Sequence, residues 1–297
     1  MNVRACPALL SLLYLCPLCL CGEPSSLESR LLPLAKAHKG KVAIAVKHLG
    51  SGESFYLNAD EPMPTASLIK LPVMLEVYQQ AEEGKVKLTD RVTLHQEDKV
   101  PGSGILTYHF SDGTTFSLRD ACRLMIAFSD NTATNLVLDK IGITPVNKRM
   151  KTWGYPNTKI NAKSFRGSTT SVAPERTKKY GLGSTTAREM IAILEDLETC
   201  KHCRPVVKQI ILNHLRKCDD KDKFSRYLPE GVDLAHKTGS VSKARTDAGI
   251  MYLPSGAIAI CVLTDENEDA RWKPDNAGNV LCARVGKEVY DWFTRTE

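Results

Sequence analysis

The sequence predicts an α/β (α+β) fold in which an antiparallel sheet, built from both ends of the chain and flanked by helices, adjoins an all-helical subdomain. Strand patterns occur near the two ends, whereas helical patterns fill the middle. A chain of 297 residues with 42% hydrophobic side chains can bury a large core. We therefore expect a discontinuous α/β subdomain at residues 23–61 and 219–297, and a helical subdomain at residues 62–218.

The first 22 residues are expected to be a signal peptide. Arg4 gives a positive start, and a largely apolar run extends from Ala8 to Leu20. That run is too short to cross a bilayer, and no later stretch reaches the length of about 18 apolar residues that a span requires. We expect an exported protein, periplasmic or secreted. A lipid anchor at Cys21 is disfavoured because Leu20 is large for the position before such a cysteine.

The amino-terminal elements follow from periodicity and turn residues. Residues 27–37 alternate as an amphipathic helix, and residues 41–47 and 54–57 have strand composition around a turn at Gly50-Ser-Gly52. From residue 67 the pattern is helical and apolar almost all round as far as Tyr78, which is typical of a helix buried on every side.

The later elements complete the two subdomains. Residues 154–183 show no clear period, and an aperiodic loop of that length inside a domain is usually functional. Helical patterns occur at residues 117–128, 131–141, 145–153, 185–201, 205–217 and 276–293, and strand patterns at residues 232–237, 248–253 and 257–264.

The sequence argues against nucleic-acid, cofactor and metal partners. The formal net charge of +6, from 40 basic and 34 acidic side chains, is too small to indicate nucleic-acid binding. Nothing in the sequence implies a cofactor. Cys200-Lys-His-Cys203 with Cys218 invites a zinc interpretation, but an exported protein without a second spaced pair favours a disulfide between neighbouring helices and a leftover thiol. We expect a monomer with no metal.

Ser67-Leu-Ile-Lys70 opens the buried helix and places a hydroxyl and an amine on one face. A serine becomes nucleophilic when a base removes its proton, and a lysine can be that base if burial lowers its pKa. Alone the pattern is weak, because Ser67 could simply cap the helix and a second instance runs from Ser240 to Lys243.

Two further motifs strengthen the catalytic interpretation. Ser129-Asp130-Asn131 stands between two predicted helices, where it could otherwise serve only as a cap. Lys237-Thr238-Gly239-Ser240 ends a predicted strand, and Gly239 would let a ligand approach the backbone closely. All three motifs in this order are unexpected by chance.

With these motifs, the sequence resembles the class A serine β-lactamases and, more distantly, the penicillin-binding D-alanyl-D-alanine peptidases. The likeness covers nearly the whole mature chain. It includes the stretches Val100–Leu106, Ser117–Ala121, Met125–Asn135 and Ser184–Met190.

The resemblance implies a site in the cleft between the two subdomains. Ser67 would be the acylated nucleophile, Lys70 its proton partner and Ser129 the proton shuttle to the leaving nitrogen. The resemblance also implies that Asn131 binds a side-chain amide of the substrate and that its carboxylate is bound by Lys237, Thr238 and Ser240. The backbone amides of Ser67 and Ser240 would bind the oxyanion.

The chain also departs from that family. The Glu-x-x-Leu-Asn pattern that activates the deacylating water is missing, and Glu175 is the only acid between Asp139 and Glu189. Cys122 matches a cysteine that is often disulfide-bonded in relatives, but Met74 stands at the partner position, so we expect a buried free thiol. Arg245 lies near the place of an arginine that supports the substrate carboxylate.

The leading functional hypothesis is an exported serine hydrolase that opens the β-lactam amide through an acyl-serine intermediate. The alternatives are a D-alanyl-D-alanine peptidase or related peptidoglycan amidase, and a penicillin-binding protein that stays acylated. Because Glu175 lacks the family context, we expect slow deacylation that depends more on Lys70 than on Glu175.

Overall fold

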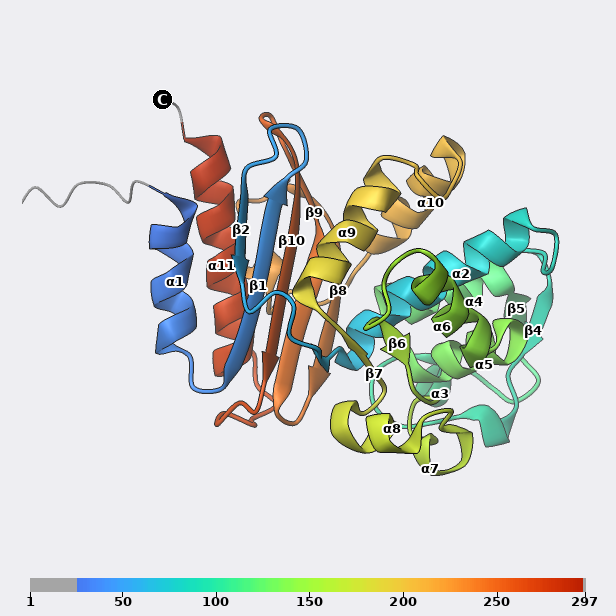
Figure 1. The fold of residues 1–297 in the computed structure, drawn as a ribbon. Helices are drawn as coiled ribbons and strands as arrows, with labels where there is room; N and C mark the ends of the chain where they lie inside the picture. Colours follow the sequence, from blue (N-terminus) through green and yellow to red (C-terminus); the bar gives the residue numbers. More distant parts are fainter. Residues whose placement is uncertain (1–25, 296–297) are drawn as a thin grey trace, which may run out of the picture.

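The computed structural model describes residues 26–295 and confirms the predicted fold class. A five-stranded antiparallel sheet stands in the middle (Figure 1). Helices α1 (Leu27–Ala37) and α11 (Ala277–Thr294) cover one face, and the helical subdomain lies beyond the other (Figure 1). The predicted signal peptide and Cys21 lie outside the described residues. Within residues 26–295, no helix is long and apolar enough to cross a membrane.

The sheet joins strands from both ends of the chain, as predicted. Its order is β2-β1-β10-β9-β8, and β1 pairs with β10 so that Val42 lies opposite Thr264. Strand β8 therefore forms one edge, which faces the helical subdomain (Figure 1). The bounds are β1 (Lys41–His48), β2 (Ser54–Leu57), β8 (Asp233–Val241), β9 (Ala244–Leu253) and β10 (Gly256–Asp265).

Both faces of the sheet are buried, which explains the continuous apolar runs in its central strands. Ile258 and Ile260 of β10 pack in a core with α1 and α11, whereas Ala259 and Cys261 pack in the core of the helical subdomain. Successive side chains of a strand point to opposite faces. The sheet thus carries two cores, one on each side.

Helix α2 (Lys70–Glu82) is the centre of the helical subdomain and is buried from Lys70 to Tyr78, as its pattern predicted. The short 3₁₀ helix η1 (Ala66–Ile69) precedes it. Around α2 pack α4 (Leu118–Ala127), α5 (Asn131–Ile141), α6 (Ile143–Thr152) and α10 (Pro205–Leu215), while α9 (Ala187–Glu198) packs against β1 and β10.

Residues 154–183 contain more regular structure than their sequence indicates. Strands β6 (Lys159–Ile160), β7 (Gly183–Thr185) and β3 (Met63–Pro64) form a small sheet, and β3 leads directly into η1. Helices α7 (Gly167–Thr170) and α8 (Pro174–Tyr180) lie between β6 and β7. Elements this short leave no measurable period. The sequence pattern also did not indicate β4 (Arg91–Thr93), β5 (Thr115–Ser117), α3 (Leu106–His109), η2 (Gln96–Asp98) and η3 (Phe224–Tyr227). Because β4 pairs with β5, residues 62–218 carry two small sheets, and the subdomain expected to be all-helical is mainly helical.

The expected disulfide among Cys200, Cys203 and Cys218 is wrong for this structure. All six cysteines of the described part are free thiols, and Cys122 is a buried one, as expected. The first two follow α9 and are half-buried, whereas Cys218 is buried beside β8 and bonds its backbone amide to Leu215 after α10. Residues 26–295 contain no cluster of three or more metal-binding side chains.

Candidate active site

Ser67 is held at the junction of the two subdomains. Thr65 donates its amide to Gly183 (2.9 Å), and its own carbonyl accepts a bond from the Thr246 hydroxyl of β9 (2.9 Å). The next residue, Ala66, has a positive φ of 47° and turns the chain into η1. Side chains three residues apart eclipse one another in a 3₁₀ turn. Ser67 and Lys70 therefore share one side of the helix start.

The Lys70 amine is fully buried and makes three polar contacts. It donates to the Ser129 carbonyl (2.7 Å), to the Ser129 hydroxyl (3.3 Å) and to Asn131 Oδ1 (2.9 Å). Burial lowers the pKa of Lys70 well below its ordinary value, and the positive charge of Lys237 lowers it further, against an opposing effect of Asp130. The neutral amine, which can accept a proton, is therefore easier to reach than in an ordinary exposed lysine.

The Ser129-Asp130-Asn131 turn connects α4 to α5, and Ser129 lines the same cavity as Ser67. Ser129 has a positive φ of 50°, and Asp130 caps α5 by accepting a bond from the Ala133 amide (2.8 Å). The same carboxylate accepts bonds from the amides of Ile105 (2.7 Å) and Leu106 (2.9 Å). Asp130 therefore fixes both its own turn and the facing loop, and this rigid support positions the Ser129 hydroxyl.

The third motif brings Lys237 to the same hydroxyl. Its amine, buried at the edge strand β8, donates to Ser129 Oγ (3.1 Å) and to the Thr238 carbonyl (2.7 Å). Burial lowers the pKa of Lys237 below its ordinary value, although the Cys218 and Asp220 charges oppose that shift. Ser129 Oγ thus lies between two lysine amines, a position from which a proton can move in either direction.

Gly239 allows β8 to pass close to Ser67. A Cβ atom at this position would lie 2.8 Å from the Ser67 amide nitrogen and 2.5 Å from the Thr65 carbonyl oxygen. Only a residue without a side chain fits there. The backbone of β8 therefore runs directly beside the start of η1.

Ser67 opens into two adjoining cavities. One, of about 350 Å³, is also lined by Ser129, Lys237 and Thr238. The other, of about 470 Å³, is lined by Asn131 and by residues of the 154–183 segment. Ser240 lines both. Both volumes suit a small molecule.

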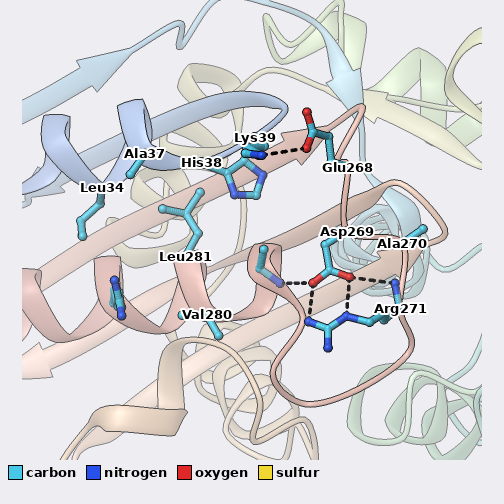
Figure 2. Close-up of a pocket in the computed structure, with 12 residues that line it drawn as sticks. Leu34, Ala37, His38, Lys39, Glu268, Asp269, Ala270, Arg271, Val280 and Leu281 are labelled. Carbon is cyan, nitrogen blue, oxygen red and sulfur yellow. Dashed lines mark hydrogen bonds and ion pairs between the residues drawn. The ribbon is translucent and has the colours of Figure 1, made fainter.

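A larger hollow of about 710 Å³ lies between α1, α11 and the loop after β10, away from the three motifs. Figure 2 shows that charged groups lining it are paired with one another: Arg271 lies 2.8 Å from Asp269, and Lys39 lies 3.3 Å from Glu268. The buried lysine pair and the serines instead gather at Ser67. We therefore place the candidate active site there.

Comparison with known proteins decides the family. A model of the Beta-lactamase enzyme family matches residues 26–293. The chain belongs to this family. It is 28% identical to a beta-lactamase of Streptomyces fradiae over 92% of this chain and 88% of that one. The structure of a beta-lactamase from Sphaerobacter thermophilus has a TM-score of 0.78, with 28% identity over 90% of this chain and 97% of that one. The structure of PBP-A has a TM-score of 0.77, with 25% identity over 90% of this chain and 95% of that one.

Two candidate residues of this beta-lactamase family member are not brought to Ser67. Glu175 lies on α8 with an exposed side chain and lines neither cavity. Arg245 lies on the face of the sheet that α11 covers, where its guanidinium donates to the carbonyls of Ala244 (2.9 Å) and Arg271 (2.9 Å). Neighbouring residues of a strand face opposite sides of the sheet. The position of Arg245 just after the turn between β8 and β9 therefore does not by itself place its side chain in the cleft.

Ser164 belongs to the site, although the sequence did not single it out. Its backbone is clamped by Asn135, which accepts a bond from the Ser164 amide (2.8 Å) and donates to its carbonyl (3.0 Å). Its hydroxyl is buried without a partner among the described protein atoms, in the wall of the 470 Å³ cavity. Asn135 lies one helical turn after Asn131 and therefore on the same side of α5. This spacing is the feature of the sequence that could have indicated a further polar group at the site.

Proposed function

We propose that this chain is an exported serine hydrolase that opens β-lactam amides through an acyl-serine intermediate on Ser67. The observation that carries the proposal is the Ser129 hydroxyl held between the buried amines of Lys70 and Lys237 beside the nucleophile. Export is supported by the sequence of residues 1–22.

Acylation follows from the geometry around Lys70. Neutral Lys70 accepts the Ser67 proton, directly or through Ser129, as Ser67 Oγ attacks the β-lactam carbonyl carbon. The amide C–N bond then breaks, and Ser129 delivers a proton to the departing nitrogen. The Lys237 ammonium, Thr238 and Ser240 would hold the substrate carboxylate, and Asn131 its side-chain amide.

The developing oxyanion needs donors on the opposite side of the carbonyl. The backbone amides of Ser67 and Ser240 are the candidates, and the close passage of β8 at Gly239 supports their convergence. No step calls for a metal or a cofactor.

Deacylation is expected to be slow. A carboxylate is the usual base for the attacking water, but the residues lining the 470 Å³ cavity include none. Asp219 and Asp220 line the other cavity, where Asp220 is paired with Lys223 at 2.5 Å. Lys70, whose pKa is lowered by burial, is the candidate proton acceptor, and we assign it this second role.

A peptidase or penicillin-binding role is the second candidate. The same observation, a cavity wall without a carboxylate, favours it, because an acyl-enzyme that clears slowly acts as a trap for penicillin. The substrate would then be a peptide ending in D-alanyl-D-alanine, and release of D-alanine would identify it.

The deciding experiment is the reaction with a chromogenic cephalosporin, followed by intact mass spectrometry. Repeated turnover supports the hydrolase, a single stoichiometric burst supports the second candidate, and absence of any adduct contradicts both. Ser67→Ala should abolish the adduct. Ser240→Ala, which alters the other Ser-x-x-Lys pattern, should still form it. An adduct that persists in Ser67→Ala would show that another residue is the nucleophile.

A further inference from the structure

Cys218 lines the 350 Å³ cavity together with Ser67 and Lys237, yet the proposed mechanism gives it no task. The residue is only 4% exposed, and its sulfur lies 4.0 Å from Thr238 Oγ1. A small molecule that enters the cavity therefore reaches this sulfur before it reaches any other cysteine of the described chain.

A buried imidazole and a buried carboxylate stand on the neighbouring strands β8 and β9. His236 Nδ1 is 2.9 and 3.1 Å from the two oxygens of Asp247, and the Phe224 amide donates to the same carboxylate (3.0 Å). His236 and Asp247 are 2% and 0% exposed. Asp247 thus orients the ring with Nδ1 as a donor. His236 and Thr238 are two residues apart on β8 and face the same side of the sheet, and the Cys218 sulfur lies 4.0 Å from Thr238 Oγ1, so the ring and the sulfur are on the same side.

The charges of this group favour a thiolate. Burial alone would lower the pKa of His236, but Asp247 and Cys218 raise it to about 10, so the ring is a cation at neutral pH. Burial alone would raise the pKa of Cys218, but the positive charges of His236 and Lys237 outweigh burial and the opposing charge of Asp247 and lower it to about 7. Thiolates, not thiols, attack electrophiles.

The other cysteines lack this environment. Cys122, Cys261 and Cys282 are fully buried, and burial raises the pKa of each thiol. Cys203 is half-buried, and burial is the main cause that raises its pKa to about 11. Among these cysteines, Cys218 combines a position in the cavity wall with cationic neighbours.

We propose that Cys218, with His236 and Asp247, is a second nucleophilic site in the cleft, at which small disulfides and similar soft electrophiles modify the protein and close the substrate cavity. In the step with a disulfide, the Cys218 thiolate attacks one sulfur, a new S–S bond forms and the old S–S bond breaks. The other half leaves as a thiolate and takes up a proton from solvent. The closing effect rests on the proposed function, whereas the reactivity of Cys218 does not.

Labelling of the full mature chain tests the reactivity. Iodoacetamide would be applied from pH 5.5 to 9, and the labelled cysteines would be quantified by peptide mass spectrometry. We expect Cys218 to react at least tenfold faster at pH 7 than Cys200 or Cys203, with a rate midpoint near pH 7. Equal rates, or a midpoint above pH 8.5, would overturn the proposal.

Variants separate the parts of the site. Cys218→Ser should remove the fast-reacting fraction, whereas the matched Cys200→Ser should leave it unchanged. His236→Asn should move the rate midpoint to higher pH. If His236→Asn does not fold, the pH profile of the parent protein remains decisive, because a thiol without a cationic neighbour titrates above pH 8.

The closing effect is tested with methyl methanethiosulfonate, which adds a methylthio group to a thiolate. Modification should reduce acylation by a fluorescent penicillin at least tenfold, and dithiothreitol should restore it. Undiminished acylation of the modified protein would refute closure. If the parent protein never reacts with penicillin but its Cys218 still reacts fast with iodoacetamide, the proposed function is refuted and the proposal of a reactive thiolate at Cys218 is supported.

Discussion

Gly239→Ala should disable the site with only a moderate loss of stability. The added Cβ would lie 2.5 Å from the Thr65 carbonyl oxygen and from Thr246 Oγ1, and 2.8 Å from the Ser67 amide nitrogen, where ordinary contact begins near 3.4 Å. The backbone of β8 must therefore move by up to about 0.9 Å relative to η1, because two of the crowded atoms belong to the backbone.

The size of the effect follows from that displacement. Overpacking of this kind costs about 1–3 kcal/mol of unfolding free energy. A misplacement of about 1 Å at a reacting centre costs roughly 100-fold in rate, or ~2.7 kcal/mol. We expect the second-order rate of penicillin acylation to fall roughly 100-fold, and the Tm to fall by about 2–4 °C for each kcal/mol lost.

The assay is stopped-flow acylation by a fluorescent penicillin, with thermal unfolding measured on the same samples. Gly278→Ala is the matched control, because its Cβ would lie 2.8 Å from Arg245 Cγ on the opposite face of the sheet. The control should lose similar stability and keep most of its acylation rate. If Gly239→Ala acylates at the parental rate, or if both variants lose the same activity, the close approach of β8 does not position Ser67.

Three further outcomes are expected. Glu175→Gln should clear its penicillin adduct within twofold of the parental rate, because the exposed side chain lines neither cavity; accumulation of the adduct, seen by mass, would make Glu175 the deacylation base. Ser164→Glu should clear the adduct at least tenfold faster than the parent, because it adds a carboxylate to the cavity wall beside Ser67. Ser164→Gln has the same shape without a base and should not clear it faster. Equal rates for the two variants would refute the argument that deacylation is slow for want of a carboxylate base. The acylation rate should fall as pH falls through the lowered pKa of Lys70, since only the neutral amine accepts a proton, and a flat rate profile from pH 5 to 9 would contradict that role.

The sequence by itself determined the parts of the fold that depend on local pattern. The apolar positions around α2 predicted its burial as far as Tyr78, and the strand patterns at both ends predicted a sheet shared by the termini. These features follow from side-chain periodicity, which the linear sequence records directly. The order of the three motifs also indicated the family, which the matching model confirms.

Tertiary structure alone decided how the polar groups meet. Ser129 Oγ contacts Lys70 and Lys237, which are 59 and 108 residues away in sequence, and no local pattern encodes such contacts. Residues 154–183 likewise looked aperiodic, yet pairing of β6 with β7, and of β7 with β3, fixes the segment beside the cleft.

The same distinction explains which candidate residues were misplaced or missed. Arg245 was a candidate because it follows the Lys-Thr-Gly motif, and Glu175 because it is the only acid of its segment. Strand facing and helix exposure directed both side chains away from Ser67. Cys218 was grouped with Cys200 and Cys203 by spacing, whereas packing of the chain after α10 against β8 placed it beside His236. Sequence records residue type and period; the direction of a polar side chain depends on which distant element packs against it.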